Sequence, residues 1–154
     1  MPNHCHNRVT IYTATGDDDS VAKIAKLKQI FEDENCFGQI IPEPDWANQP
    51  LMSKDIKGIV YDRGKLGELP VDGRFQSTDR QDDRWYDWRV NNWDTKWDAY
   101  DVVITDDDPQ CTEIEFNTAW SPPEAVCHAI RAQYPDLAVS WFFDEPGCEI
   151  AGYL

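Results

Sequence analysis

The chain has little positive charge. Its 154 residues include 14 Lys and Arg against 29 Asp and Glu, which gives a formal net charge of −15. Binding to DNA, RNA or an anionic membrane requires a surplus of basic side chains. The composition therefore predicts no direct nucleic-acid partner and no membrane partner. It favours a protein partner with a basic surface, although the same acidity would also serve solubility alone.

Long apolar runs and paired cysteines are also lacking. No apolar stretch approaches transmembrane length and no signal-peptide pattern opens the chain, so we expect a cytoplasmic protein. The five cysteines are scattered and include no Cys-x-x-Cys pair, which argues against a disulfide scaffold or a zinc site. At this length we expect a single domain over 1–154 with a substantial core.

Catalytic signatures are missing too. The sequence contains no phosphate-binding loop, no Gly-x-Ser-x-Gly and no His-Glu-x-x-His, so no catalytic residue and no cofactor is predicted. His4-Cys5-His6 is a dense set of metal-capable side chains, and loss of Met1 would give His4 the spacing of an amino-terminal copper or nickel site. We expect instead that Cys5 packs as a small apolar residue and that the two histidines point to opposite sides, so no metal ligand is assigned.

The periodicity of apolar residues indicates both strands and helices. Alternation predicts strands at 7–13, 101–105, 111–120, 137–143 and 148–153. Helical spacing predicts a helix that starts at 17–20 and ends at 35–38, a second at 83–92, and a third after Ser121-Pro122-Pro123-Glu124, which has the pattern of a capping box. We read Asp106-Asp107-Asp108-Pro109 as a turn.

Residues 39–83 interrupt this pattern. Proline and glycine are frequent there, so we predict an insertion packed on the core, with short strands at 58–61 and 73–77. The remaining order is β-α-β-β-α-β with an extra carboxy-terminal strand. This order predicts an α+β fold, a ferredoxin-like split βαβ antiparallel sheet with two helices.

A tryptophan-rich segment at 85–98 follows the insertion. Three interpretations stay open: a core element that clamps the insertion, an exposed interface, or a stacking platform for bases. The platform lacks basic neighbours, and we favour the core. The residues assigned to this structural motif are Trp85, Trp88, Trp93, Lys96, Trp97 and Trp120.

Part of this segment carries a family resemblance. Residues 92–98, Asn-Trp-Asp-Thr-Lys-Trp-Asp, resemble the Asn-Trp-Gly-Thr-Lys-Trp signature of YubB-type proteins. Residues 2–7 and 116–123 are similar to that family's amino terminus and strand-to-helix corner. The resemblance implies a ferredoxin-like domain encoded by plasmids, prophages or phages, with no agreed activity. Asp94 stands where the family has glycine, and aspartate tolerates a left-handed backbone better than most residues.

The fold also invites comparison with RNA-recognition domains, whose open sheet face stacks bases. The predicted open face presents Glu113 and Glu115 at its centre, and two carboxylates there repel a phosphate backbone. We therefore predict that this face does not read nucleic acid. The other residues predicted on it are Thr10, Tyr12, Asn117, Ser140 and Phe142.

These observations favour a non-enzymatic accessory protein of a mobile genetic element that binds a protein. A sharper version is a mimic of nucleic-acid charge that blocks a host defence or DNA-processing protein. Two alternatives stay open: a small-molecule or metal-dependent enzyme with a site between the insertion and the sheet, and a structural homo-oligomer. The predicted partner contacts are Asp17, Asp18, Asp19, Asp106, Asp107, Asp108, Glu113 and Glu115.

Overall fold

The computed structural model describes residues 3–46, 51–52, 74–75 and 84–154. Contacts within the chain divide it into two compact units: Met1–Pro42 with Val90–Leu154, and Glu43–Arg89. Most of the predicted insertion at 39–83, including the predicted strand at 58–61, lies outside the described residues. Among those that are described, no helix combines the length and the hydropathy needed to cross a bilayer.

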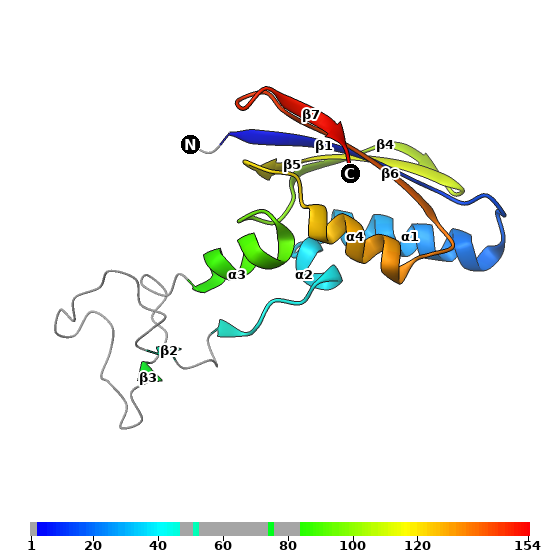
Figure 1. Cartoon of the computed structure of the whole chain (residues 1–154). Helices are drawn as coiled ribbons and strands as arrows, with labels where there is room; N and C mark the ends of the chain where they lie inside the picture. Colours follow the sequence, from blue (N-terminus) through cyan, green and yellow to red (C-terminus); the bar gives the residue numbers. More distant parts are fainter. Residues whose placement is uncertain (1–2, 47–50, 53–73, 76–83) are drawn as a thin grey trace. The chain divides into compact units, whose positions relative to one another are not determined.

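The larger unit is built on a five-stranded antiparallel sheet in the order β4-β5-β1-β6-β7 (Figure 1). The first four of these strands have the ferredoxin-like arrangement, and β7 extends the sheet beside β6. The predicted α+β ferredoxin-like fold and its extra carboxy-terminal strand are thereby confirmed. The bounds are β1 His4–Tyr12, β4 Tyr100–Asp108, β5 Cys111–Ala119, β6 Ala138–Glu145 and β7 Ile150–Tyr153.

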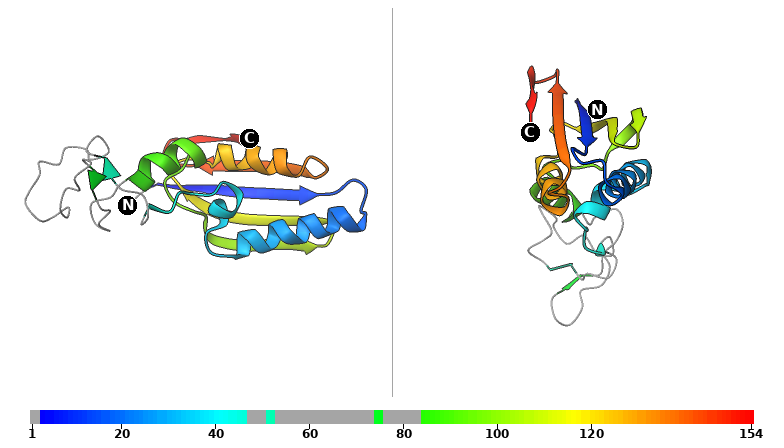
Figure 2. Two further views of the ribbon diagram at one scale, coloured as in Figure 1. Left: turned by 90° about the horizontal axis from the view of Figure 1, so that it is seen from below. Right: turned by 90° about the vertical axis from the view of Figure 1, so that its right-hand side faces the viewer.

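Three helices lie on one face of this sheet, as Figures 1 and 2 show. They are α1 Asp18–Glu32, α2 Cys36–Ile40 and α4 Glu124–Gln133. Asp17 starts α1, because its carboxylate accepts a hydrogen bond from the Ser20 backbone N–H at 2.8 Å. The short helix α2 was not predicted. It follows Asn35, whose φ of 60° turns the chain directly after α1, and it extends to Ile40 into the predicted insertion.

The core forms between this face and the helices. Alternate residues of β1 and β5 are buried, and Phe116 packs against Phe31 and Trp141 with ring centroids 5.3 and 5.6 Å apart. The polar side chain of Asn7 is also completely buried. Its amide accepts a hydrogen bond from the Trp141 indole at 3.0 Å and donates one to the Thr118 hydroxyl at 2.9 Å. Because its hydrogen bonds are made, this buried amide links β1 to β5 and β6 on the side of the sheet that faces the helices.

The smaller unit includes a two-stranded sheet, in which β2 Leu51–Met52 pairs with β3 Arg74–Phe75. The second of these strands lies within the predicted strand at 73–77. Helix α3 Arg84–Trp93 begins in this unit, one residue from the predicted start. Arg89 forms an ion pair with Glu43 at 2.8 Å, and its guanidinium lies 5.2 Å from the centre of the Trp85 ring.

Three local predictions were wrong. Residues 106–108 are not a turn: β4 continues through Asp108, and the reversal falls at Pro109 and Gln110. The strand predicted at 111–120 does not include Trp120: β5 ends at Ala119, and Trp120 has a φ of 70° and a side chain that is 47% exposed. His4 and His6 point to the same side of β1, since residues two apart on a strand face the same way.

The predicted capping box is also absent. The residue before α4 is Pro123, and the proline side chain has no acceptor for a backbone N–H. Ser121, the predicted cap, lies two positions earlier. The hydroxyl of Ser121 instead donates to the backbone carbonyl of Asp94. The start of α4 is capped from a distant part of the chain, as the next subsection describes.

Candidate functional site

The face of the sheet opposite the helices is uncovered by any described element of its unit (Figures 1 and 2). Strand alternation places every second side chain there, and the pairing register aligns these side chains into rows across the five strands. The central row runs, from β4 to β7, through Val103, Glu115, Arg8, Phe142 and Tyr153.

Negative charge dominates this face. The five strands together carry eight carboxylates and one guanidinium, that of Arg8. In the row beside the centre, Asp106 pairs in register with Glu113. The acids on or bordering the open face are Asp101, Asp106, Glu113, Glu115 and Asp144.

Threonine and histidine side chains contact the two central glutamates. The Thr105 hydroxyl donates to Glu113 at 2.8 Å, and a ring nitrogen of His6 lies 3.6 Å from a Glu115 oxygen. The other ring nitrogen of His6 lies 3.2 Å from the Asn117 amide oxygen. These contacts orient the carboxylates, and no lysine or arginine among the described residues forms an ion pair with either of them, so their negative charge remains available to a partner.

The predicted acids do not form one patch. Asp106, Glu113 and Glu115 come together on the sheet, whereas Asp17, Asp18 and Asp19 lie at the start of α1. The Thr15 hydroxyl, followed by the Ser20 N–H, lowers the pKa of Asp17 to about 2, as expected for a helix cap.

Lysines hold two of the remaining acids in ion pairs. Asp19 pairs with Lys23 at 2.8 Å, and Lys28 pairs with Asp107. Asp108 accepts a hydrogen bond from the backbone N–H of Gln110 at 2.8 Å, which shapes the hairpin turn. Hydrogen bonds or ion pairs within the chain therefore engage four of the predicted contact acids, Asp17, Asp19, Asp107 and Asp108.

Aromatic side chains occupy the other half of the open face. The Arg8 guanidinium lies 5.4 Å from the centre of the Phe142 ring, and the rings of Phe142 and Tyr153 meet edge to face at 5.3 Å. Tyr153 is 72% exposed. Sequence reasoning missed Arg8, Asp144 and Tyr153 as site residues, although continued alternation along their strands would have placed all three on this face.

The tryptophan motif is a junction between elements of the larger unit. Trp93 is fully buried, packs on Phe37 at 5.7 Å and donates its indole N–H to the Ile41 carbonyl at 3.1 Å. Asp94 has a φ of 65°, and its carboxylate accepts the Ala125 N–H at 2.8 Å, which caps α4. The left-handed backbone therefore occurs at the position where the resembling family has glycine.

The next residues of the motif continue the junction. The hydroxyl of the buried Thr95 donates to the Ala119 carbonyl at 3.0 Å, at the end of β5. Asp98 accepts the Phe37 N–H at 2.9 Å, in the first turn of α2. The segment thus ties α2, α4 and β5 together through side-chain hydrogen bonds.

Other members of the predicted motif are more exposed. Trp85, Trp88 and Lys96 are half-buried, and the Lys96 ammonium lies 4.6 Å from the centre of the Trp97 ring. Trp97 is 37% exposed and meets Tyr100 at 6.4 Å. With Trp120, these side chains make the motif partly core and partly surface.

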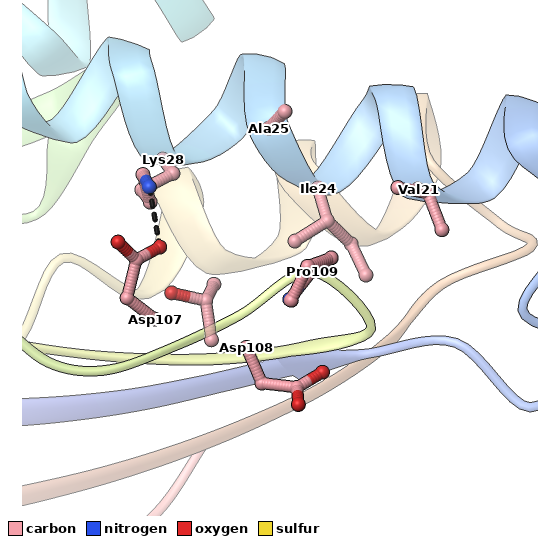
Figure 3. Close-up of a pocket in the computed structure, with 8 residues that line it drawn as sticks. Val21, Ile24, Ala25, Lys28, Asp107, Asp108 and Pro109 are labelled. Carbon is pink, nitrogen blue, oxygen red and sulfur yellow. Dashed lines mark hydrogen bonds and ion pairs between the residues drawn. The ribbon is translucent and has the colours of Figure 1, made fainter.

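A small hollow lies on the helix side, between α1 and the β4–β5 hairpin (Figure 3). Its volume is about 160 Å³, its lining is mostly apolar, and the ion pair of Lys28 and Asp107 stands at its edge. Sites for small-molecule ligands are typically about 300–1,000 Å³. The hollow is lined by Val21, Ile24, Ala25, Lys28, Asp107, Asp108, Pro109 and Thr112.

Side chains that could hold a metal do not cluster in the described part of the chain. It contains no group of three His, Cys, Asp or Glu side chains placed to hold a metal ion. All five cysteines are free, and burial raises the pKa of Cys5 to about 11, which keeps its thiol protonated. The predicted alternative of an enzyme site between the insertion and the sheet concerns residues largely outside the described ones.

Comparison with known proteins agrees with the fold. Residues 92–154 match the family model described as the ferredoxin-like domain in Api92-like protein. Among solved structures, the chain is similar to the crystal structure of a protein api92 from Yersinia pseudotuberculosis, with 10% sequence identity and a TM-score of 0.52. That alignment covers 99% of this chain and 93% of the other. No curated protein sequence matches, and neither match assigns an activity.

Proposed function

We propose that this chain is a non-enzymatic protein-binding module whose open sheet face takes the basic surface of another protein. The observation that carries the proposal is the uncovered face itself, on which five carboxylates outnumber a single guanidinium. Complementary charge steers two proteins together and fixes their orientation. Tyrosine, arginine and phenylalanine beside the acids add the kind of side chains that anchor interfaces.

The spacing of the carboxylates supports mimicry of nucleic-acid charge. Neighbouring strands lie about 4.8 Å apart, and residues two apart on a strand about 6.7 Å apart, so the acids on this face form a dense array of negative charge, as the phosphates of a duplex do. Asp106, Glu113 and Glu115 occupy such neighbouring positions. A protein whose groove accepts phosphates is therefore the partner we propose, and its nucleic-acid site is what this chain blocks.

The same chemistry argues against a homo-oligomer built through this face. A second copy would bring its own five carboxylates against the first, and like charges placed together cost free energy. The resemblance to YubB-type proteins supports the remaining parts of the proposal: a cytoplasmic accessory protein of a plasmid or phage that acts on a host defence or DNA-processing protein.

The test is affinity capture from a bacterial lysate with three baits at low and high salt. One bait is the wild type, and the second replaces the sheet acids by Asp106→Asn, Glu113→Gln and Glu115→Gln. The control has the same change in charge on the helix side, through Asp18→Asn, Glu32→Gln and Glu34→Gln. All six positions are outside the buried core, so both variants are expected to fold.

We expect the wild type and the control to retain the same basic protein at low salt and to lose it at high salt, since ions screen exposed charges. The sheet variant should lose it at both. Retention by the sheet variant, or retention that does not change with salt, would contradict the proposal. A captured protein that no longer binds nucleic acid would support the mimicry.

A further inference from the structure

The open face is uneven, with carboxylates concentrated on β4 and β5 and aromatic rings on β6 and β7. Along the central row, Glu115 is followed by Arg8 and then by Phe142 and Tyr153. A partner that covers the whole face therefore meets negative charge at one end and exposed aromatic surface at the other.

The side chain of Arg8 lies between the acidic and the aromatic parts of this face. The Arg8 guanidinium lies over the Phe142 ring at 5.4 Å, on the strand between Phe142 and Glu115. A guanidinium is planar and weakly hydrated, so it stacks on an aromatic face while its N–H groups reach a carboxylate. The ammonium of lysine is a compact, strongly hydrated charge and gains less from such a place.

A similar combination of a carboxylate and aromatic rings occurs at the edge of the sheet, where no lysine or arginine of the described residues forms an ion pair with the carboxylate. Asp144 lies on β6 two residues from Phe142, and Tyr153 pairs with Phe142 in register on β7. Diagonal neighbours of this kind lie within reach of long side chains. The Asp144 side chain is exposed and makes no ion pair with a described residue, and Tyr153 is 72% exposed.

We propose that Phe142, Asp144 and Tyr153 form a subsite for an arginine side chain of the partner. The partner of the open face is therefore arginine-rich rather than merely basic: one guanidinium stacks against Tyr153 and pairs with Asp144, and other cations reach Glu113 and Glu115. This inference rests on the proposed function, because it names the side chain that the acidic face selects.

The test uses two fluorescent peptides of equal length and charge in a Gly-Ser background. All the cationic residues are arginine in one peptide and lysine in the other. Fluorescence anisotropy at low salt gives the two dissociation constants for the full chain. We expect the arginine peptide to bind about fivefold more tightly. Tyr153→Leu should bring the ratio close to one and leave the affinity for the lysine peptide unchanged.

Ile150→Ala is the matched control on the same strand. Ile150 is also exposed, but it pairs with the buried Glu145 and so lies on the opposite side of the sheet. The ratio of the two dissociation constants for Ile150→Ala should equal that of the wild type. Equal binding of the two peptides to the wild type, or a preference that survives in Tyr153→Leu, overturns the arginine subsite and leaves the acidic face standing. If neither peptide binds at low salt, the proposed function itself fails.

Discussion

The carboxylate of Asp94 accepts the backbone N–H of Ala125 at 2.8 Å, and so a residue 31 positions earlier caps helix α4. The residue next to the helix, Pro123, has no side-chain acceptor for this role. Asp94 reaches it from a left-handed backbone with a φ of 65°. A strained position in the tryptophan motif is thereby coupled to the start of a helix elsewhere in the sequence.

Substitutions of Asp94 distinguish the contribution of its hydrogen bond to α4 from the cost of its left-handed backbone. Asp94→Ala removes the acceptor and keeps the left-handed backbone, so we expect the free energy of unfolding to fall by about 1–2 kcal/mol. Asp94→Asn keeps an acceptor and tolerates this backbone, so it should be close to neutral. Asp94→Gly should fall between the two, because relief of strain offsets part of the lost cap. Urea unfolding measures all three, and an alanine variant as stable as the wild type would refute the cap.

The buried amide of Asn7 offers a second prediction, about the core. Asn7→Leu leaves the indole N–H of Trp141 without its acceptor, and an orphaned buried donor costs about 1–3 kcal/mol. Adding Trp141→Phe removes that donor as well. We therefore expect the double variant to be less destabilised than the sum of the two single variants, as measured by chemical denaturation. Simple additivity would show that the hydrogen bond adds nothing beyond packing.

Glu145 predicts a pH dependence of stability. Hydrogen bonds from the Cys148 thiol, and from the backbone N–H groups of Cys148 and Gly147, hold the pKa of this buried carboxyl below its ordinary value against the opposing effect of burial. A lowered folded-state pKa stabilises the fold above the unfolded-state value of about 4.3. That contribution is lost as the pH falls through the lower, folded-state pKa.

Glu145→Gln isolates this contribution. The variant should be less stable than the wild type at neutral pH, and the difference between the two should shrink as the pH is lowered below about 4. Urea unfolding over a pH series measures it, and subtraction removes the titration of the other acids. A difference that stays constant down to the acid limit would mean that the charge of Glu145 contributes nothing.

Periodicity in the sequence was enough to predict the sheet and its long helices. Val9 and Ile11, or Ile114 and Phe116, alternate with polar residues because one face of each strand is buried, and that pattern is local. The predicted face with Glu113 and Glu115 follows from the same alternation.

What the sequence could not predict depends on contacts between distant residues. The cap of α4 comes from Asp94, and helix α2 starts where Asp98 accepts the Phe37 N–H, 61 positions apart in the chain. Local patterns suggested Ser121 for the cap and a turn at 106–108. At the start of α4 the tertiary hydrogen bond with Asp94 replaces the local cap. At 106–108 pairing with β5, as of Asp107 with Thr112, extends β4 in place of the turn.

The most direct test of the central claim, that a basic partner binds the open sheet face, is to map where it binds. Titration of the ¹⁵N-labelled chain with the arginine peptide, followed by amide chemical shifts, reads every backbone position. We predict that shifts concentrate on β5, β6 and β7, around Glu115, Phe142 and Tyr153, and that they vanish at high salt. Shifts centred instead on Asp17–Asp19 at the start of α1, or spread evenly over all acidic residues, would contradict the account.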